Sequence, residues 1–336
     1  MTLATGVGSM PGGEPLGSES DNALDYAEAV RVVLGELPDL VHLPELPGRG
    51  AAATMTGRGL ALTSGLGADL QPAGWRLTDA SGIDHRRARS LVSQDLDAVE
   101  EQAQGWTGTF KVQVAGPWTL SATVEKPRGD KVLSDHGARR DLAQALAEGL
   151  RDHVADLRRR LPEAAELLVQ VDEPALPAVL AGQIPTASGF GRHRVVHPPE
   201  ASEALEAVFA AITDAGAVPL VHCCASGFPI GLVRGAGARG ISVDLDQLDP
   251  AAYDALAEAA EAGEWVLLGA VPSTDPSAEP DARQVTERVL RTVDMLGLEP
   301  GPRLAVTPSC GLAGASPRWA RTALGLARQA AHDLES

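Results

Sequence analysis

The stretch ARRDLAQALAEGLRDHVADLRRRL, residues 138–161, and the apolar run LLVQVD that follows it at 167–172 decide the fold class. Leucines recur along the first stretch at positions mostly one or two helical turns apart, so it predicts an amphipathic helix. The second run is short, apolar and rich in valine, which is typical of a buried strand. The same succession of a strand and a helix extends over the whole chain.

Eight runs of this kind predict strands, at about 3–8, 39–43, 110–115, 167–172, 217–222, 239–244, 265–271 and 303–307. The Ala-, Leu-, Arg- and Glu-rich segments between them predict helices, at about 20–36, 84–104, 137–160, 200–215, 229–237, 250–262, 280–297 and 317–333. This count predicts an α/β protein, a single (β/α)8 TIM barrel over residues 1–336 with no internal linker. A doubly wound open sheet is the alternative, but GVGSMPGG after the first strand lacks the Gly-x-Gly-x-x-Gly spacing.

Local signals add two expectations. Helix N-caps are predicted at Ser202 or Glu203, at Asp249 and at Ser316, the last two being followed by proline. The stretch 44–83, rich in Gly, Pro and Thr, is predicted to be an extended loop, and loops of that length are usually functional or mobile.

Composition excludes several partners. The formal net charge of −17 argues against binding to nucleic acid or to an anionic membrane, because both repel an acidic surface. Three cysteines are too few for a disulfide framework and fit a reducing compartment. The N-terminus has no secretory pattern, and no uninterrupted apolar run reaches the length of a membrane span. We therefore expect a soluble cytoplasmic protein.

Polar residues follow the predicted strands at one end. The strand ends carry Gly8-Ser9, Pro44-Glu45, Gly116-Pro117-Trp118, Asp172-Glu173-Pro174, His222-Cys223-Cys224, Asp244, Pro272-Ser273-Thr274 and Ser309-Cys310-Gly311. Active sites of (β/α)8 barrels are built at this C-terminal face from several strands at once. We expect these side chains to converge there.

Three of them predict a zinc site. His222 and Cys224 are two residues apart in a strand and share a face, which leaves Cys223 on the opposite one. With Cys310 they form a set of imidazole and thiolate ligands that suits Zn²⁺. Asp244 is the preferred acidic fourth ligand, and Asp246, further into the loop, is the alternative. The other interpretation is that the three are unrelated core residues, since free cysteine is often buried and inert.

The chain resembles the catalytic domain of cobalamin-independent methionine synthase. The motifs that carry the resemblance occur in the family's order over about residues 5–315: GVGSMPG, HLPELPGRG, VAGPWTL, VQVDEPAL, PLVHCCASGF, ISVD and PSCGL. The resemblance implies a zinc-dependent methyltransferase on the barrel shared with uroporphyrinogen decarboxylase-like proteins. It implies the metal ligands His222, Cys224, Asp244 and Cys310, and an amino-acid site at Ser9, Glu45 and Asp172.

Three departures from the family pattern concern the acidic ligand and the methyl donor. The acidic ligand is an aspartate where the family usually has glutamate. The family's second, N-terminal barrel, which helps to bind folate, has no counterpart in this sequence. The seventh strand ends in GAVPSTDP, where the family has a histidine that serves proton transfer to the folate. The expected donor is thus either a folate or a corrinoid protein, with the corrinoid or a small methylated compound preferred.

The expected chemistry is methylation of the homocysteine thiol to give methionine. A metal that binds the substrate sulfur makes its thiolate available at neutral pH. Glu45 and Asp172 are the candidate catalytic carboxylates and would hold the α-ammonium group, with backbone amides near Ser9 taking the α-carboxylate. His42, His193 and His197 are expected to be solvated or structural. The alternatives are another thiol alkyltransferase of the same barrel family, or a metal-binding accessory protein without donor chemistry.

Overall fold

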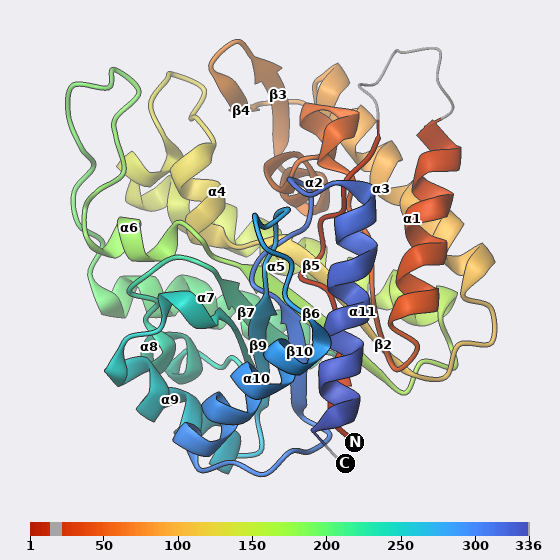
Figure 1. The fold of residues 1–336 in the computed structure, drawn as a ribbon. Coiled ribbons are helices and arrows are strands. Elements are labelled where there is room, and N and C mark those ends of the chain that lie inside the picture. Colours follow the sequence, from red (N-terminus) through yellow and green to blue (C-terminus); the bar gives the residue numbers. More distant parts are fainter. Residues whose placement is uncertain (14–21, 335–336) are drawn as a thin grey trace.

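The computed structural model describes residues 1–13 and 22–334, and its centre is a sheet of eight parallel strands (Figure 1). The order in the sheet is β1-β10-β9-β8-β7-β6-β5-β2. The bounds are β1 Leu3–Ala4, β2 Leu40–His42, β5 Thr109–Ala115, β6 Glu166–Asp172, β7 Val218–Cys223, β8 Gly240–Asp244, β9 Trp265–Val271 and β10 Leu304–Pro308. Each predicted strand is present, and the predicted (β/α)8 TIM barrel is confirmed. The open sheet is excluded.

The barrel closes at its C-terminal rim. The first and last strands of the sheet, β1 and β2, are short, and the bridge between their extensions joins Ser9 to Glu45. The Met10 amide donates to the Glu45 carbonyl at 2.8 Å, and the Glu45 amide donates to the Gly8 carbonyl at 3.1 Å. Two of the predicted site residues therefore also complete the barrel.

The helices surround this barrel (Figure 1). Those that follow the strands are α1 Asn22–Glu36, α3 Ile83–Gln102, α5 His136–Arg160, α7 Pro198–Asp214, α8 Ile230–Gly235, α9 Pro250–Glu261, α10 Ala282–Leu296 and α11 Pro317–Asp333. They match the eight predicted helices, although residues 20–21 of the first prediction lie outside the described residues. The caps at Asp249 and Ser316 are confirmed. The cap at Ser202 or Glu203 is wrong, because Pro198 and Pro199 start α7 directly after His197.

The stretch 44–83 is more ordered than predicted. It contains the helix α2 Met55–Leu62 and the antiparallel hairpin of β3 Gly67–Gln71 and β4 Gly74–Thr78. Two short helices, α4 Pro117–Thr123 and α6 Leu176–Leu180, were also not predicted. Among the described residues, no helix has the length and apolar character needed to cross a membrane.

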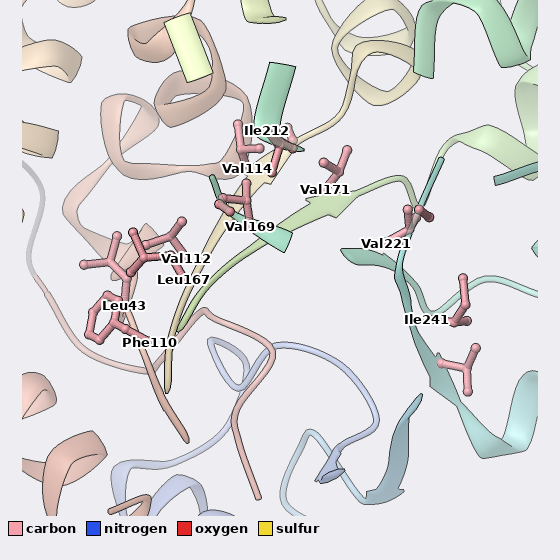
Figure 2. Packing of buried hydrophobic residues seen from close by; sticks show 14 of the residues in the cluster. Leu43, Phe110, Val112, Val114, Leu167, Val169, Val171, Ile212, Val221 and Ile241 are labelled. Carbon is pink, nitrogen blue, oxygen red and sulfur yellow. The ribbon is translucent and has the colours of Figure 1, made fainter. Parts of the chain in front are cut away.

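Alternation along the strands separates two environments. The outward residues of the strands form one apolar layer with the helices, part of which is shown in Figure 2, including Val112, Val114, Val169 and Val171. A smaller cluster, Leu40, Leu168, Leu220, Trp265, Leu267 and Ala305, packs separately. Above it, at positions of the same parity, the strands carry buried polar side chains: His42, Lys111, Gln113, Gln170, Asp172, His222 and Ser242. The barrel interior is thus apolar at its base and polar towards the rim.

Candidate metal and amino-acid site

Three predicted metal ligands converge at the rim. His222 lies near the end of β7, Cys224 follows that strand, and Cys310 follows β10. Their ligand atoms all lie within 4.8 Å of one another, although 86 residues separate the two cysteines. The order of β7, β8, β9 and β10 in the sheet brings them to one side of the barrel mouth.

A neighbour fixes the orientation of the His222 ring. Its Nδ1 lies 2.9 Å from Ser242 Oγ on β8, whereas its buried Nε2 has no hydrogen-bond partner among the described residues. A buried polar atom without a partner is costly, so Nε2 is suited to a cation. Ser242 is not among the predicted site residues, although its place two residues before Asp244 in ISVD puts both on one face of the strand.

The two thiols are in direct contact. Cys224 Sγ and Cys310 Sγ lie 2.9 Å apart, and both residues are partly exposed. The hydrogen bond between them lowers the pKa of Cys224 and raises that of Cys310, as expected for two thiols that share a proton. One unpaired imidazole nitrogen and two adjacent sulfur atoms are a donor set that fits zinc.

Cys223 belongs to a different environment. It is buried on the other face of β7, its thiol donates to the Ala225 carbonyl at 3.9 Å, and burial raises its pKa to about 12. A thiol held in this state is a poor metal ligand.

The two acidic candidates differ in their contacts. Asp244 is half-buried, and its carboxylate accepts a hydrogen bond from the Asp246 amide at 2.9 Å. Burial raises the pKa of Asp244, and His222 opposes that shift. Asp246 is exposed and pairs with Arg288 of α10 at 2.6 Å. Neither belongs to the three-residue group, but Asp246 is held in an ion pair with Arg288, and Asp244 makes no ion pair within the described residues, so Asp244 stays the predicted fourth ligand.

Asp172 lies beside the predicted metal ligands, since it pairs in register with His222 of the neighbouring strand. Its carboxylate is buried and accepts a hydrogen bond from Gln170 Nε2 at 2.7 Å. Burial raises its pKa, while His222 and the hydrogen bond from Gln170 oppose that shift. The carboxylate therefore has one side held by the protein and another available to a ligand.

Glu45 already has a partner, which sequence analysis did not predict. Its carboxylate is paired with Arg58 Nε at 3.0 Å, and Arg58 also contacts Asp95. Arg49 donates twice to the same Asp95, at 2.8 Å each. All four side chains are buried. Glu45 is thus rigidly placed and partly neutralised, so Asp172 is the less compensated carboxylate.

Ser9 contacts both Glu45 and the loop that carries Cys310. Besides its bridge to Glu45, its carbonyl accepts from the Leu312 amide at 2.8 Å, two residues beyond Cys310. A side chain at Gly311 would collide with Ser9 Oγ, so the two loops pack closely. The structure therefore brings the predicted Ser9, Glu45, Asp172, His222, Cys224 and Cys310 to one rim.

Glu173, next to Asp172, is a structural residue. One carboxylate oxygen accepts from the Trp118 amide at 2.9 Å, and the other accepts from the Thr119 amide at 2.8 Å and its hydroxyl at 2.7 Å. Burial raises its pKa to about 7. It anchors the start of α4, so the Asp-Glu-Pro motif carries one predicted site residue and one residue with a structural role.

The predicted structural roles of two histidines also fit their contacts. His42 is buried in the barrel, where its Nδ1 accepts from the Gly6 amide at 3.2 Å, and burial lowers its pKa. His193 is buried against Asp130 at 3.2 Å. His197, the N-cap of α7, is exposed.

A family model described as the catalytic domain of cobalamin-independent synthase matches residues 103–333. Among solved structures, a B12-independent methionine synthase from Shewanella sp. W3-18-1 in complex with selenomethionine matches with a TM-score of 0.67 at 14% identity, over 100% of this chain and 98% of that one. A methylaspartate ammonia lyase mutant from Clostridium tetanomorphum matches with a TM-score of 0.46 at 11% identity, over 100% of this chain and 59% of that one. No curated protein sequence matches.

Proposed function

This chain belongs to the family of cobalamin-independent synthase catalytic domains, and from that premise we propose that it is a zinc-dependent methyltransferase that converts homocysteine to methionine. The observation that carries the proposal is the convergence of an unpaired imidazole nitrogen and two thiols next to a buried carboxylate. We assign residues 1–336 to one catalytic domain.

The metal half of the site would be His222, Cys224 and Cys310, with Asp244 as the fourth ligand. When bound, zinc supplies a site at which a substrate thiol is held as the nucleophilic thiolate near neutral pH. Ser242 keeps the His222 ring oriented with Nε2 towards the thiols. Two cysteines and an aspartate make this site anionic, which keeps a bound sulfur electron-rich.

The amino-acid half would place the substrate beside the metal half. Asp172 holds the α-ammonium group, with Glu45 as a second, partly neutralised carboxylate. The Gly8-Ser9 turn receives the α-carboxylate through backbone amides. Because Asp172 is in register with His222, an amino acid bound there directs its side-chain sulfur towards the metal ligands.

The methyl donor is proposed to be a carrier whose leaving group needs no proton. A folate amine must be protonated as it leaves, and a positioned general acid contributes about 10²–10⁴ in rate. After β9 the chain offers Ser273, Thr274 and Asp275 but no imidazole. Asp275 accepts two hydrogen bonds from Ser316 at 2.6 Å each, which lower its pKa. A carboxylate held in its ionised form is a poor acid, so a corrinoid or small methylated donor is favoured over a folate.

The test compares two donors. Zinc-loaded protein and homocysteine are incubated with methylcobalamin or with methyltetrahydrofolate, and methionine is measured by mass spectrometry. We expect turnover with methylcobalamin and little or none with the folate. Efficient turnover with the folate would contradict the donor assignment alone. A protein that binds zinc but neither binds homocysteine nor forms methionine would contradict the proposed function and favour an accessory role.

A further inference from the structure

A buried lysine lies inside the barrel, in the same polar layer as the site. Lys111, on β5, is fully buried, and its Nζ donates to Gln170 Oε1 and to the Val7 carbonyl, both at 2.9 Å. It makes no ion pair within the described part of the chain. Burying an ammonium group without a paired carboxylate is unfavourable, because the group loses its hydration. Because a lysine destabilises the fold at this position, its presence suggests that it has a function in the site.

Lys111 determines which way the Gln170 amide faces. An ammonium group only donates hydrogen bonds, so Gln170 must turn its oxygen towards Lys111. The amide nitrogen then faces the other way, where it donates to Asp172 Oδ1 at 2.7 Å and to the Val7 carbonyl at 2.9 Å. Without the lysine, the amide could present its oxygen to the carboxylate, and that contact would be repulsive.

The same pair holds the turn before Ser9. Both Lys111 and Gln170 donate to the Val7 carbonyl, two residues upstream of Ser9. The Gly6–Ser9 segment lies beyond the end of β1, so these side chains supply contacts that the strand does not. One buried pair therefore connects the carboxylate of the site with its glycine-serine turn.

We propose that Lys111 and Gln170 act as a positioning pair that makes the site selective for thiols bearing an α-ammonium group, by holding the Asp172 carboxylate towards the substrate. This inference rests on the proposed function. Neither side chain touches the reacting sulfur. Electrostatic attraction to Asp172 and Glu45 keeps the Lys111 charge favourable in spite of burial, which lowers its pKa. An ammonium ligand would contact the side of the Asp172 carboxylate that Gln170 does not occupy, whereas a thiol without an amino group leaves that side without a donor.

The test uses two thiols that differ only at the amino group. Homocysteine and 4-mercaptobutyrate share the thiol and the carboxylate, and the second has hydrogen in place of the ammonium. Calorimetry measures the affinity of each for zinc-loaded wild type, Lys111→Met, Gln170→Leu, the double variant and Asp172→Asn. Lys126→Met, a change to a surface lysine on the loop after α4, is the matched control.

Asp172→Asn sets the size of the effect, because its amide keeps an oxygen for Gln170 and turns an NH₂ group to the ligand. We expect it to weaken homocysteine binding at least about tenfold, or about 1.4 kcal/mol. Lys111→Met should reproduce that loss and leave 4-mercaptobutyrate binding within about twofold, because Gln170 still donates to the Val7 carbonyl and holds the turn before Ser9. The double variant should lose at least as much as either single variant, because it also removes the second of the two contacts to the Val7 carbonyl. Lys126→Met should change neither affinity.

Two results would overturn the inference alone: an unchanged homocysteine affinity in Lys111→Met and Gln170→Leu, or an equal loss for both thiols, which would indicate general damage to the barrel. If Lys111→Met fails to fold, Gln170→Leu alone tests the inference. In that variant Lys111 keeps its hydrogen bond to the Val7 carbonyl. A wild-type protein that binds the two thiols equally would overturn the proposed function and this inference with it.

Discussion

At the scale of single residues, the environment of each side chain decides its chemistry more than its type does. Three cysteines lie near one another in this barrel, yet one thiol is inert and two form a contact pair. The difference follows from strand parity, which directs Cys223 outwards and Cys224 to the site. The same applies to two adjacent acids. Asp172 lies in the polar layer of the barrel, where it accepts a hydrogen bond from Gln170, while Glu173 accepts hydrogen bonds from backbone amides at the start of α4.

This separation predicts how serine substitutions affect the metal. Cys310→Ser should lose most of the bound zinc, because serine removes one of two adjacent sulfur ligands. Cys223→Ser should retain it, since that thiol lies on the other face of β7 and contacts a carbonyl. Elemental analysis of the purified proteins measures both. Full zinc content in Cys310→Ser, or its loss in Cys223→Ser with the fold intact, would refute the ligand assignment.

Residue spacing and the barrel fold predicted that His222, Cys224 and Cys310 lie together, as they do, but not the partners of the carboxylates. His222 and Cys224 are two apart on a strand, and Cys310 ends another, so the convergence follows from the barrel alone. The ion pair of Glu45 could not be predicted, since Arg58 lies in a stretch whose composition indicates a loop. Lys111 is visible as a polar residue in the apolar run FKVQVA, but its partner Gln170 is on another strand.

At the scale of elements, periodicity predicted the eight strands and the eight helices between them, but it missed the hairpin of β3 and β4 and the helices α2, α4 and α6. Helix α2 contains Gly57 and Gly59, which lower its intrinsic propensity. Both are required by close packing: a side chain at Gly57 would collide with carbonyls of Ala51 and Ala52, and one at Gly59 would press on Leu120 and Ala115. Such tertiary contacts cannot be predicted from the local sequence.

The same packing argument gives a prediction for α5. A glycine inside a helix is normally less stable than alanine by about 0.5–1 kcal/mol. Gly149, in the middle of α5, lies so close to the Leu62 carbonyl that a methyl group would collide with backbone. We expect Gly149→Ala to destabilise the protein by about 1–3 kcal/mol.

Gly325 of α11 is the matched control for this change. Its nearest neighbour to an added methyl would be Glu36 Oε2 at 3.6 Å, an ordinary contact. Gly325→Ala should therefore be neutral or stabilising. Urea unfolding of the three proteins measures the difference, and a stabilised Gly149→Ala would show that α5 does not approach the loop after α2 as described.

At the scale of the whole molecule, the contact that closes the barrel lies within the predicted site. The two end strands of the sheet, β1 and β2, join through Ser9 and Glu45, which are also predicted site residues. The apolar cluster at the base of the barrel supplies stability, and the polar layer above it carries the site. Burying the polar side chains of that layer is unfavourable for folding, and the burial of the far larger outer apolar layer offsets it.

One source of acid sensitivity of the whole fold is a buried histidine outside the proposed site. His153 of α5 is buried, and burial lowers its pKa to about 4, with Arg58 and Arg160 acting in the same direction. The unfolded chain binds a proton at this residue below about pH 6.5, whereas the folded protein does so only near pH 4. The unfolded state therefore holds more protons in this window, and stability falls as the pH drops from about 6.5 to about 4.

The substitution His153→Leu removes this contribution to the pH dependence of stability, because leucine does not titrate. We compare the metal-free proteins at pH 7.5 and pH 5. Between these values the free energy of unfolding of wild type should fall by about 2 kcal/mol more than that of the variant, because pH 5 lies about 1.5 units below the pKa of histidine in the unfolded chain. Urea unfolding at the two pH values measures it, and chelation keeps metal release out of the comparison. His136→Gln, an exposed change at the start of the same helix, should behave like wild type. An equal loss in wild type and His153→Leu would show that His153 is not buried in its neutral form, and the acid sensitivity of the barrel would then have to arise elsewhere.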